Sequence, residues 1–219
     1  MPDHWPLFKL RLTTPRLELR LPSLEDLDQL ADRAAEGIHD PDVMPFIPPW
    51  TDVPGDELPR NVILSNLGEI ARWRPERWCC NFAVIFDGQA IGVQDLSATD
   101  FAVTREVHTG SWLGRLHQGR GLGTEMRAAV LHLAFTGLGA LSAISAAFEH
   151  NSPSLAVSRK LGYQPDGLSI HNVRGRRTVA HRMRLDRYAF TSPIPVEIHG
   201  LKPCLPHFGL SDPVTGQCE

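Results

Sequence analysis

A glycine-rich turn is the stretch whose residue types point most directly to a ligand. Gly119, Gly121 and Gly123 alternate along the chain, and a helical pattern begins near Thr124. Glycines let the backbone bend tightly and bring its N–H groups close to a ligand, and a helix N-terminus adds unpaired donors and a positive dipole end. The turn is therefore suited to a diphosphate, although spaced glycines after a strand also form purely structural turns.

Two other nucleotide-binding motifs fit this sequence poorly. A Walker loop requires Gly-Lys-Ser/Thr, and the chain contains no Gly-Lys dipeptide. The dinucleotide fingerprint requires G-x-G-x-x-G and an acidic residue about 20 positions later at a strand end. The chain has G-x-G-x-G and lacks that acid. The histidines show no spacing typical of metal ligands, so we expect no metal site.

The elements that must position this turn alternate between strands and helices. Alternating apolar and polar residues predict a strand over 10–21, and Ser23 is an expected N-cap for the helix that follows. Asp87-Gly88 between apolar runs predicts a hairpin turn. The other predicted elements are helices over 58–74, 124–135 and 153–160, strands over 81–86, 89–96, 107–113 and 143–148, and a hairpin over 170–186. This order indicates a mixed α/β domain with about seven strands.

The motifs, taken in order, resemble those of the GNAT N-acyltransferases. Gln118-Gly-Arg-Gly-Leu-Gly123 matches the family's Q/R-x-x-G-x-G/A loop for acyl-CoA. The other matching motifs are Thr14-Pro15-Arg16-Leu17, Asp87-Gly88 with Ile91-Gly92, Asn151 with Ser154, and Leu161-Gly162-Tyr163. The set covers about residues 9–188 and looks like the branch of the RimJ/RimL ribosomal-protein N-terminal acetyltransferases. The resemblance implies one GNAT domain over 9–190 with a mostly antiparallel twisted sheet, followed by a proline-containing C-terminal extension over 191–219.

The resemblance also implies acetyl-CoA or another acyl-CoA as co-substrate. In the family, backbone amides of the glycine turn hold the CoA diphosphate, and the preceding strand pairs with the pantetheine arm. Asn151 matches the residue that hydrogen-bonds pantetheine, although it also suits a helix cap. Basic side chains near the turn either neutralise CoA phosphates or are solvated surface charges. The residues expected to bind CoA are Ser111, Trp112, Leu113, Gln118, Gly119, Arg120, Gly121, Leu122, Gly123, Thr124, Asn151, Ser154, Arg159 and Lys160.

Acyl transfer from a thioester requires a proton for the departing thiolate. Many family members place a tyrosine donor seven residues after the asparagine, but this chain has Ser158 there. In the branch that the chain resembles, a serine follows the asparagine by three residues, and Ser154 matches it. We therefore expect Ser154 to contact the sulfur and act as the acid, with solvent as the alternative proton source.

The attacking amine must also lose a proton. Family members often carry an acidic residue two positions before the glycine of a Gly-x-Trp strand, and this chain has His108 there. An imidazole titrates near neutrality, so His108 is the candidate base. Glu106, two positions earlier, is expected to contact the substrate, and Glu149 and His150 are lesser candidates.

These features predict an N-acyltransferase that moves an acetyl, or a succinyl, group to a primary amine in a ternary complex. The alternative is a CoA-binding or regulatory module without turnover. The acceptor is a protein N-terminus, a lysine or a small amine, and the fold does not choose among them. The loop over 40–59 contains six prolines, and its Phe46 and Trp50 are expected to line the acceptor site.

Composition restricts the remaining partners. The 219 residues are 42% hydrophobic and 21% charged, which excludes disordered, collagenous and coiled-coil chains. A net charge of −3 argues against an electrostatic nucleic-acid binder. Four cysteines without CxxC spacing, no secretory signal and no apolar span predict a cytoplasmic protein with reduced thiols and no membrane partner. Apolar residues of the C-terminal extension leave a homo-oligomer as a further expectation.

Overall fold

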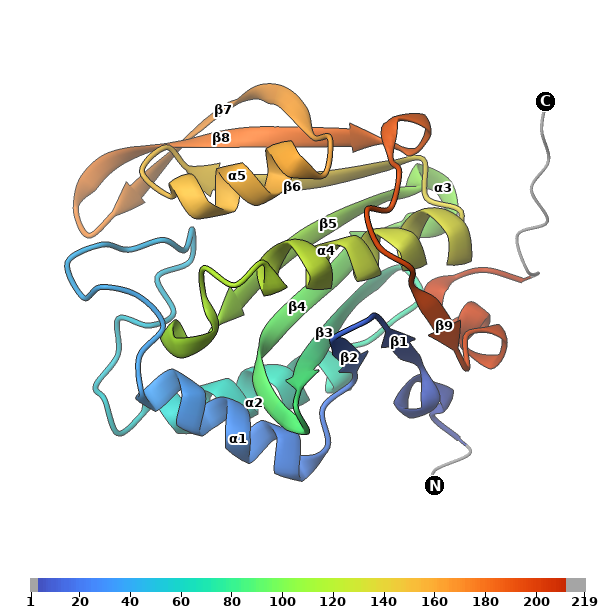
Figure 1. Ribbon diagram of the computed structural model, residues 1–219, viewed down its shortest axis with the longest axis horizontal. Coiled ribbons are helices and arrows are strands. Elements are labelled where there is room, and N and C mark those ends of the chain that lie inside the picture. Colours follow the sequence, from blue (N-terminus) through green and yellow to red (C-terminus); the bar gives the residue numbers. More distant parts are fainter. Residues whose placement is uncertain (1–3, 212–219) are drawn as a thin grey trace.

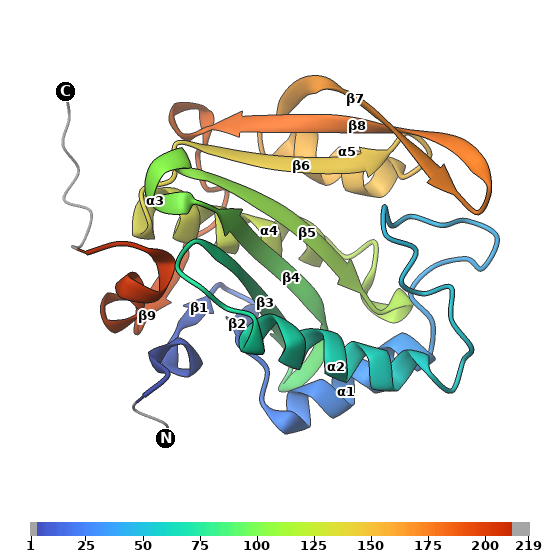
Figure 2. The same cartoon turned by 180° about the vertical axis from the view of Figure 1, so that it is seen from behind.

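One mixed β-sheet runs through the molecule, and helices cover both of its faces (Figure 1 and Figure 2). The computed structural model describes residues 4–211, with nine strands in the order β7-β8-β6-β5-β4-β3-β2-β1-β9. The strands are β1 (Arg11–Thr13), β2 (Leu17–Arg20), β3 (Arg77–Phe86), β4 (Gln89–Thr99), β5 (Glu106–Leu113), β6 (Ser142–Phe148), β7 (Gln164–Val173), β8 (Arg176–Asp186) and β9 (Glu197–His199). The α-helices are α1 (Leu24–Ala35), α2 (Leu58–Ala71), α3 (Phe101–Thr104), α4 (Leu122–His132) and α5 (Ser152–Lys160). Helices α1 and α2 pack on one face, and α4 and α5 on the other. The predicted mixed α/β class is confirmed, with two strands more than expected.

The hairpin between β3 and β4 forms as its turn residues predict. Asp87 and Gly88 both have positive φ, of 50° and 79°, as a type I′ turn requires. Glycine adopts that conformation without steric cost. The turn joins β3 and β4, which form a long antiparallel pair in the centre of the sheet. β5 pairs with the other edge of β4.

The prediction of one strand over 10–21 is wrong, because the segment folds back on itself as β1 and β2. Pro15 lies within the turn in which the Thr14 N–H donates to the Leu17 carbonyl at 2.9 Å. Proline has no N–H for a ladder, so the strand ends there. The alternating pattern correctly indicated a strand on each side of the turn, but it did not reveal that the chain reverses direction between them.

A ninth strand comes from the C-terminal extension. β9 pairs with β1, and the 3-10 helix Lys202–Phe208 buries Leu205 and Phe208. The Phe208 ring lies 4.8 Å from that of Trp78, edge to face. The extension therefore lies over its own domain, and the apolar side chains that suggested an oligomer are used within the chain. Cys218 lies outside the described residues.

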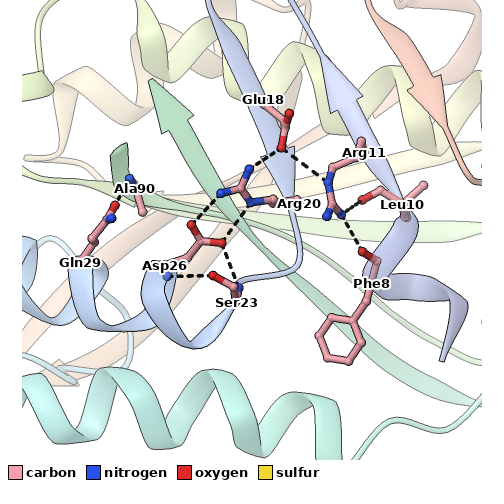
Figure 3. A network of polar contacts seen from close by, with 9 residues as sticks. All are labelled: Phe8, Leu10, Arg11, Glu18, Arg20, Ser23, Asp26, Gln29 and Ala90. Atoms are coloured by element: carbon pink, nitrogen blue, oxygen red, sulfur yellow. Dashed lines mark hydrogen bonds and ion pairs between the residues drawn. The ribbon is translucent and has the colours of Figure 1, made fainter. Parts of the chain in front are cut away.

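A polar network fixes the start of α1 against β2 (Figure 3). The Ser23 hydroxyl accepts from the Asp26 N–H, and the Asp26 carboxylate accepts from the Ser23 N–H, so the predicted cap is a complete capping box. Arg20 donates two hydrogen bonds to the same carboxylate, at 2.8 and 3.0 Å. Farther along the helix, the Gln29 side chain accepts from the N–H of Ala90 on β4. Together these bonds hold α1 on the sheet.

The strands β5 and β6 run parallel but pair over a short distance only. Their register joins 106–108 to 142–144, and beyond it the two strands diverge (Figure 1 and Figure 2). β5 stays paired with β4 up to Leu113, and β6 stays paired with β8 up to Phe148. We call this region, residues 109–113 and 145–148, the fork. Its two inner strand edges face each other without a ladder between them.

Candidate functional site

The glycine turn follows β5 at the open end of the fork and remains accessible. Gly119 and Gly121 have φ of +73° and +80°, the left-handed region that favours glycine, and both are exposed. Gly121 is the N-cap of α4. Within the described part of the chain, the N–H groups of 119–123 donate no hydrogen bond, whereas those of Gln118 and Thr124 donate to Arg115 and Gly121 carbonyls. Of the backbone N–H groups predicted to bind the diphosphate, those of residues 118–124, the five in the middle are therefore free to donate to a ligand.

Residues from the N-terminal hairpin hold this turn in shape. Thr14 donates to the Glu125 carboxylate on α4 at 2.7 Å, and Arg16 pairs with it at 2.6 Å. Arg16 also donates to the Arg120 carbonyl at 3.1 Å. The Gln118 side chain donates to the Leu113 carbonyl at 2.8 Å. The Thr-Pro-Arg motif is therefore a structural clamp on the glycine turn.

The side chains of β5 alternate between the two faces of the sheet at the fork. Thr109 and Ser111 point toward α4 and α5, where they contact Tyr163 and Arg127. His108 and Trp112 point to the opposite face, with α1 and α2. A ligand in the fork would therefore meet a different set of groups on each face.

Arg127 is the central charged residue on the α4 face. Its side chain is buried, with 3% of the residue exposed. The guanidinium donates to the hydroxyls of Ser158 at 3.0 Å and Ser111 at 3.2 Å, and a longer contact of 3.5 Å reaches Ser145. Burial lowers the pKa of Arg127. These hydroxyls come from α5, β5 and β6, so the guanidinium joins the elements that form the fork.

Asp95 of β4 is the charged residue on the opposite face. Its Oδ1 accepts from the Gly110 N–H at 2.9 Å, and its Oδ2 fills the space that a Cβ at Gly110 would need. Burial raises the pKa of Asp95 to about 6, against the lowering effect of the Gly110 bond and of Arg127, and Glu69 adds to the increase. A carboxyl with that pKa is suited to exchanging protons near neutral pH.

An aromatic row leads from the proline-rich loop to β5 on this same face. The ring centroids of Phe46 and Trp50 lie 5.1 Å apart, and those of Trp50 and Trp112 lie 5.8 Å apart. His39 extends the row, 5.6 Å from Phe46. The loop residues predicted to line the acceptor site are thus placed beside the strand that carries Gly110.

The loop is fixed across the open end of the fork. Arg174, in the turn between β7 and β8, donates to both Asp52 oxygens and to the Pro41 carbonyl at 2.8 Å. The His150 ring contacts the Met44 carbonyl at 3.0 Å. Met44 itself is buried among Phe148 and the β7–β8 hairpin. Together with the contact between Trp50 and Trp112 on β5, these contacts anchor the loop on both sides of β6.

The sequence of the chain also matches a known protein family. A family model for the acetyltransferase (GNAT) domain matches residues 16–164. The chain belongs to the GNAT acetyltransferase family. This makes it an N-acetyltransferase, and acetyl-CoA is the co-substrate that the family uses.

Solved GNAT structures share the fold. RimJ of Mycobacterium smegmatis, solved with a CoA disulfide, has a TM-score of 0.66 at 19% identity, covering 84% of this chain and 90% of RimJ. RimL, a ribosomal L7/L12 alpha-N-protein acetyltransferase solved with coenzyme A, has a TM-score of 0.61 at 17% identity, covering 79% and 95%. A GCN5-related N-acetyltransferase from Brucella melitensis has a TM-score of 0.65 at 18% identity, covering 82% and 79%. At these identities the likeness concerns the fold.

The structure brings most of the predicted CoA residues together. Asn151 is the N-cap of α5: its Oδ1 accepts from the Ser154 N–H at 3.2 Å, while its Nδ2 donates to the Pro45 carbonyl at 3.4 Å. The Ser154 hydroxyl has no hydrogen-bond partner among residues 4–211. It lies one turn from Ser158 on the same face of α5, the face that meets Arg127.

The predicted basic residues lie around the glycine turn. The Arg120 guanidinium stands over the Phe86 ring, 5.1 Å from its centroid. Arg159 and Lys160 are exposed in the last turn of α5. Val157, from the same helix, lies 3.8 Å from the position of a Cβ at Gly123. The three cations therefore lie on the elements that meet at the turn.

His108, the predicted base, and Glu106, two positions earlier on β5, have different surroundings in the structure. His108 is exposed and lines a pocket of about 290 Å³ on the α2 face, together with Glu69, Arg72 and Ser97. Glu106 lies at the joined end of β5 and β6, where it pairs with Arg184 at 2.7 Å and accepts from Ser142. The structure does not bring Glu106 to the glycine turn or to the aromatic row.

The lesser candidates for the base lie at the open end. Glu149 and His150 are both exposed after β6, and the His150 ring stacks on Phe148 at 5.4 Å. The His150 contact with Met44 anchors the loop, whereas the Glu149 N–H donates to the Val179 carbonyl of β8. The described residues contain no cluster of side chains suited to a metal ion, and no described helix is long and apolar enough to cross a membrane.

Sequence reasoning missed Asp95 and Arg127. Asp95 is the only charged residue of its strand, and Arg127 interrupts the apolar run of α4. A charged residue inside a buried element is rare without a partner or a function, and that was the available signal. It gave no indication that the two residues flank the same part of β5.

Proposed function

We propose that the chain transfers the acetyl group of acetyl-CoA to a primary amine, with both substrates bound at the fork at once. The observation that carries the proposal is the exposed glycine turn with unpaired N–H groups, placed where two parallel strands diverge. Free amides at a helix N-terminus favour a diphosphate. The unpaired inner edge of β5 offers backbone groups to the pantetheine arm.

Each part of CoA has matching groups in this chain. The N–H groups of 119–123 bind the diphosphate, and Arg120, Arg159 and Lys160 add positive charge around it. Ser111, Trp112 and Leu113 supply the strand edge, and Asn151 faces it from the start of α5. When bound, acetyl-CoA supplies an acyl group activated as a thioester.

Asp95 takes the amine proton, and His108 is the second group on that face with the chemistry to do so. Asp95 is preferred because burial raises its pKa to about 6 and because its carboxylate contacts the Gly110 N–H. His108 faces the neighbouring pocket and is exposed, which suits passing a proton to solvent. Phe46 and Trp50 line the approach of the acceptor.

Ser154 hydrogen-bonds the departing sulfur from the opposite face of the sheet, the face with α4 and α5. Its hydroxyl is unpaired in the described structure and lies on the face of α5 that meets Arg127. A serine hydroxyl is a weak acid by itself, so its role is to hydrogen-bond the sulfur while the proton reaches it from solvent.

The acceptor is a protein N-terminus, a lysine or a small amine. RimL, by its name, acetylates an α-amino group of a ribosomal protein. N-terminal peptides are therefore the first acceptors to test, followed by lysine peptides and small polyamines. The acyl group is acetyl, with succinyl as the second donor to test.

The direct test is thiol release with this panel of amines. Acetyl-CoA alone should give little free thiol, and a competent amine should raise release together with formation of an acetylated product of the expected mass. CoA binding without thiol release for any acceptor would favour the non-catalytic CoA-binding module. Absence of CoA binding would overturn the proposal altogether.

A further inference from the structure

Arg127 is a buried cation that the mechanism above does not use. Only 3% of the residue is exposed, and its guanidinium contacts serine hydroxyls from three elements. Removing a charge from water costs several kcal/mol unless a counter-charge and hydrogen bonds compensate. Neutral hydroxyls supply hydrogen bonds but no counter-charge.

The structure provides no close anion for this cation. Among residues 4–211, Arg127 forms no ion pair, and its Nε is buried without a hydrogen-bond partner. The ionisable groups that influence it are Tyr163, whose hydroxyl contacts Thr109 at 3.2 Å, and Asp95 on the other face of the sheet. Burial raises the pKa of Tyr163, so that phenol is neutral and does not balance the charge.

Of the three hydroxyls around Arg127, two donate to backbone carbonyls and one keeps its proton available for a ligand. Ser158 donates to the Ser154 carbonyl at 3.2 Å, and Ser145 donates to the Thr109 carbonyl at 3.4 Å. Ser111 accepts from Arg127 at 3.2 Å, and its own proton has no acceptor in the described structure. Ser111 is thus a polarised donor on β5, inside the fork.

We propose that Arg127, through Ser111, forms a cationic site for the sulfur of CoA and stabilises its thiolate form. The proposal rests on the proposed function. The amine nitrogen bonds to the thioester carbon, the carbon–sulfur bond breaks, and its electron pair remains on sulfur. The amine proton passes to the Asp95 carboxylate, and the sulfur later takes a proton from solvent. Arg127 stays protonated throughout.

The two faces of β5 then have complementary tasks. Asp95, with Glu69 and Cys79 near it, faces the acceptor and receives positive charge as a proton. Arg127, surrounded by hydroxyls and the neutral Tyr163, faces the leaving group and stabilises negative charge. Because both residues contact neighbouring positions of one strand, Gly110 and Ser111, the transfer takes place between opposite charges.

The test is the ionisation of CoA in its binary complex, which requires no acceptor and no turnover. Ultraviolet absorbance of the thiolate is titrated with pH, and the protein without CoA is subtracted. Burial raises the pKa of the Cys80 and Cys204 thiols, which limits their contribution. An opposite charge within a few Å lowers a pKa by about 1–3 units, so the thiol of bound CoA should titrate that far below free CoA.

Variants assign the shift to the guanidinium. Arg127→Met should abolish it, Arg127→Lys should retain most of it, and Ser111→Ala should reduce it. Arg177→Met removes an exposed arginine on β8 and should leave the shift intact. Desulfo-CoA, which has no thiol, should bind wild type and Arg127→Met with affinities within about threefold.

Two results would overturn the proposal. The first is a bound thiol in the wild type that titrates like free CoA, which needs no variant and so decides the matter even if Arg127→Met does not fold. The second is an unchanged shift in Arg127→Met. If, in addition, Arg127→Met weakens the binding of succinyl-CoA but not of acetyl-CoA, the cation is assigned to an acyl carboxylate instead. In each of these cases CoA still binds, whereas failure of the wild type to bind CoA would overturn the proposed function instead.

Discussion

Asp95 and Arg127 place opposite charges on the two faces of one strand. Asp95 contacts the Gly110 N–H from the α2 face, and Arg127 contacts the Ser111 hydroxyl from the α4 face. Both charges are held in a poorly solvated environment, where electrostatic interactions act over longer distances than in water. Their placement is more costly to the fold than apolar side chains would be, which is typical of functional groups.

Asp95→Asn should lower kcat/KM because the amide cannot accept a proton. General-base groups contribute about 10²–10⁴-fold, so a loss in that range is expected. In the wild type the rate should rise with pH through about 6, the pKa of Asp95, because the base must be deprotonated. His108→Ala is the matched comparison on the same face. If the limb near pH 6 persists in Asp95→Asn and disappears in His108→Ala, the base is His108.

The same substitution should raise stability at neutral pH. The pKa of Asp95 is about 6 in the fold and near its ordinary value when unfolded, so the folded state binds more protons in between and stability falls as pH rises through that window. Asparagine keeps an acceptor for the Gly110 N–H and removes the charge from this half-buried position. We expect a gain on the order of 2 kcal/mol at pH 7.5 that disappears near pH 4. Urea unfolding at both pH values measures it, and lower stability at pH 7.5 would contradict it.

Ser154→Ala should affect chemistry more than stability. The hydroxyl has no partner in the described structure, so its removal should change the free energy of unfolding by less than about 0.5 kcal/mol. Loss of one hydrogen bond to the developing thiolate should lower kcat about tenfold to a hundredfold, with CoA affinity nearly unchanged. Steady-state kinetics and CoA titration separate the two effects. An unchanged kcat would mean that solvent serves the sulfur without Ser154.

At the scale of elements, α1 depends on the charge of Asp26. Burial alone would raise the pKa of Asp26, but hydrogen bonds from Arg20 and Ser23 outweigh it and lower that pKa (Figure 3). Its stabilisation is therefore present above the pKa of an unfolded aspartate and is lost as pH falls through the lower folded value. This dependence is opposite in sign to that of Asp95.

Asp26→Asn should consequently destabilise the protein at pH 7 by about 1–3 kcal/mol, as expected for lost hydrogen bonds to a charged group. The difference from wild type should shrink as pH falls below the pKa of an unfolded aspartate, because the wild type then loses the stabilisation that the ionised Asp26 provides. Asp28→Asn, an exposed aspartate on the same helix, is the control and should have little effect. Equal losses for the two variants, or a loss independent of pH, would contradict the role assigned to the network.

Turns and caps were the elements most accessible from the sequence. Asp87-Gly88, Ser23 and the glycine turn depend on local backbone requirements, which residue type expresses directly. The hairpin at Pro15 and the pairing of β9 with β1 depend on contacts between distant segments, which local patterns do not contain. Arg127 was placed correctly on a helix, but α4 is buried almost all round, so periodicity did not show which neighbour it faces.

At the scale of the molecule, the loop over 40–57 joins the two halves of the sheet. It packs on α1 and β5 through Trp50, and on β6 and the β7–β8 turn through Met44 and Asp52. The fork is therefore closed at its open end by residues far away in sequence. The sequence indicated a functional loop, and its anchors on His150 and Arg174 could not be predicted because they lie more than 100 residues later.

Arg174→Ala should loosen this loop without unfolding the domain. The pair with Asp52 is exposed to solvent, which screens it, so the free energy of unfolding should stay close to that of the wild type. Amides of 40–57 should nevertheless exchange faster with deuterium, because three bonds to the loop are lost. Arg177→Ala, on the same hairpin, is the control. Equal exchange in the two variants would show that apolar contacts such as those of Met44 hold the loop alone.

The central claim is that the glycine turn grips CoA through bare backbone amides, and calorimetric titration of CoA into matched leucine variants tests it. Gly119 and Gly175 have φ of +73° and +76°, and neither has an atom within 4 Å of a built Cβ. Leucine therefore imposes the same backbone strain, about 1–2 kcal/mol, at both positions. We predict that Gly119→Leu weakens CoA binding at least about tenfold, because the side chain covers the donors, while Gly175→Leu binds like wild type. Wild-type affinity in Gly119→Leu would contradict the account.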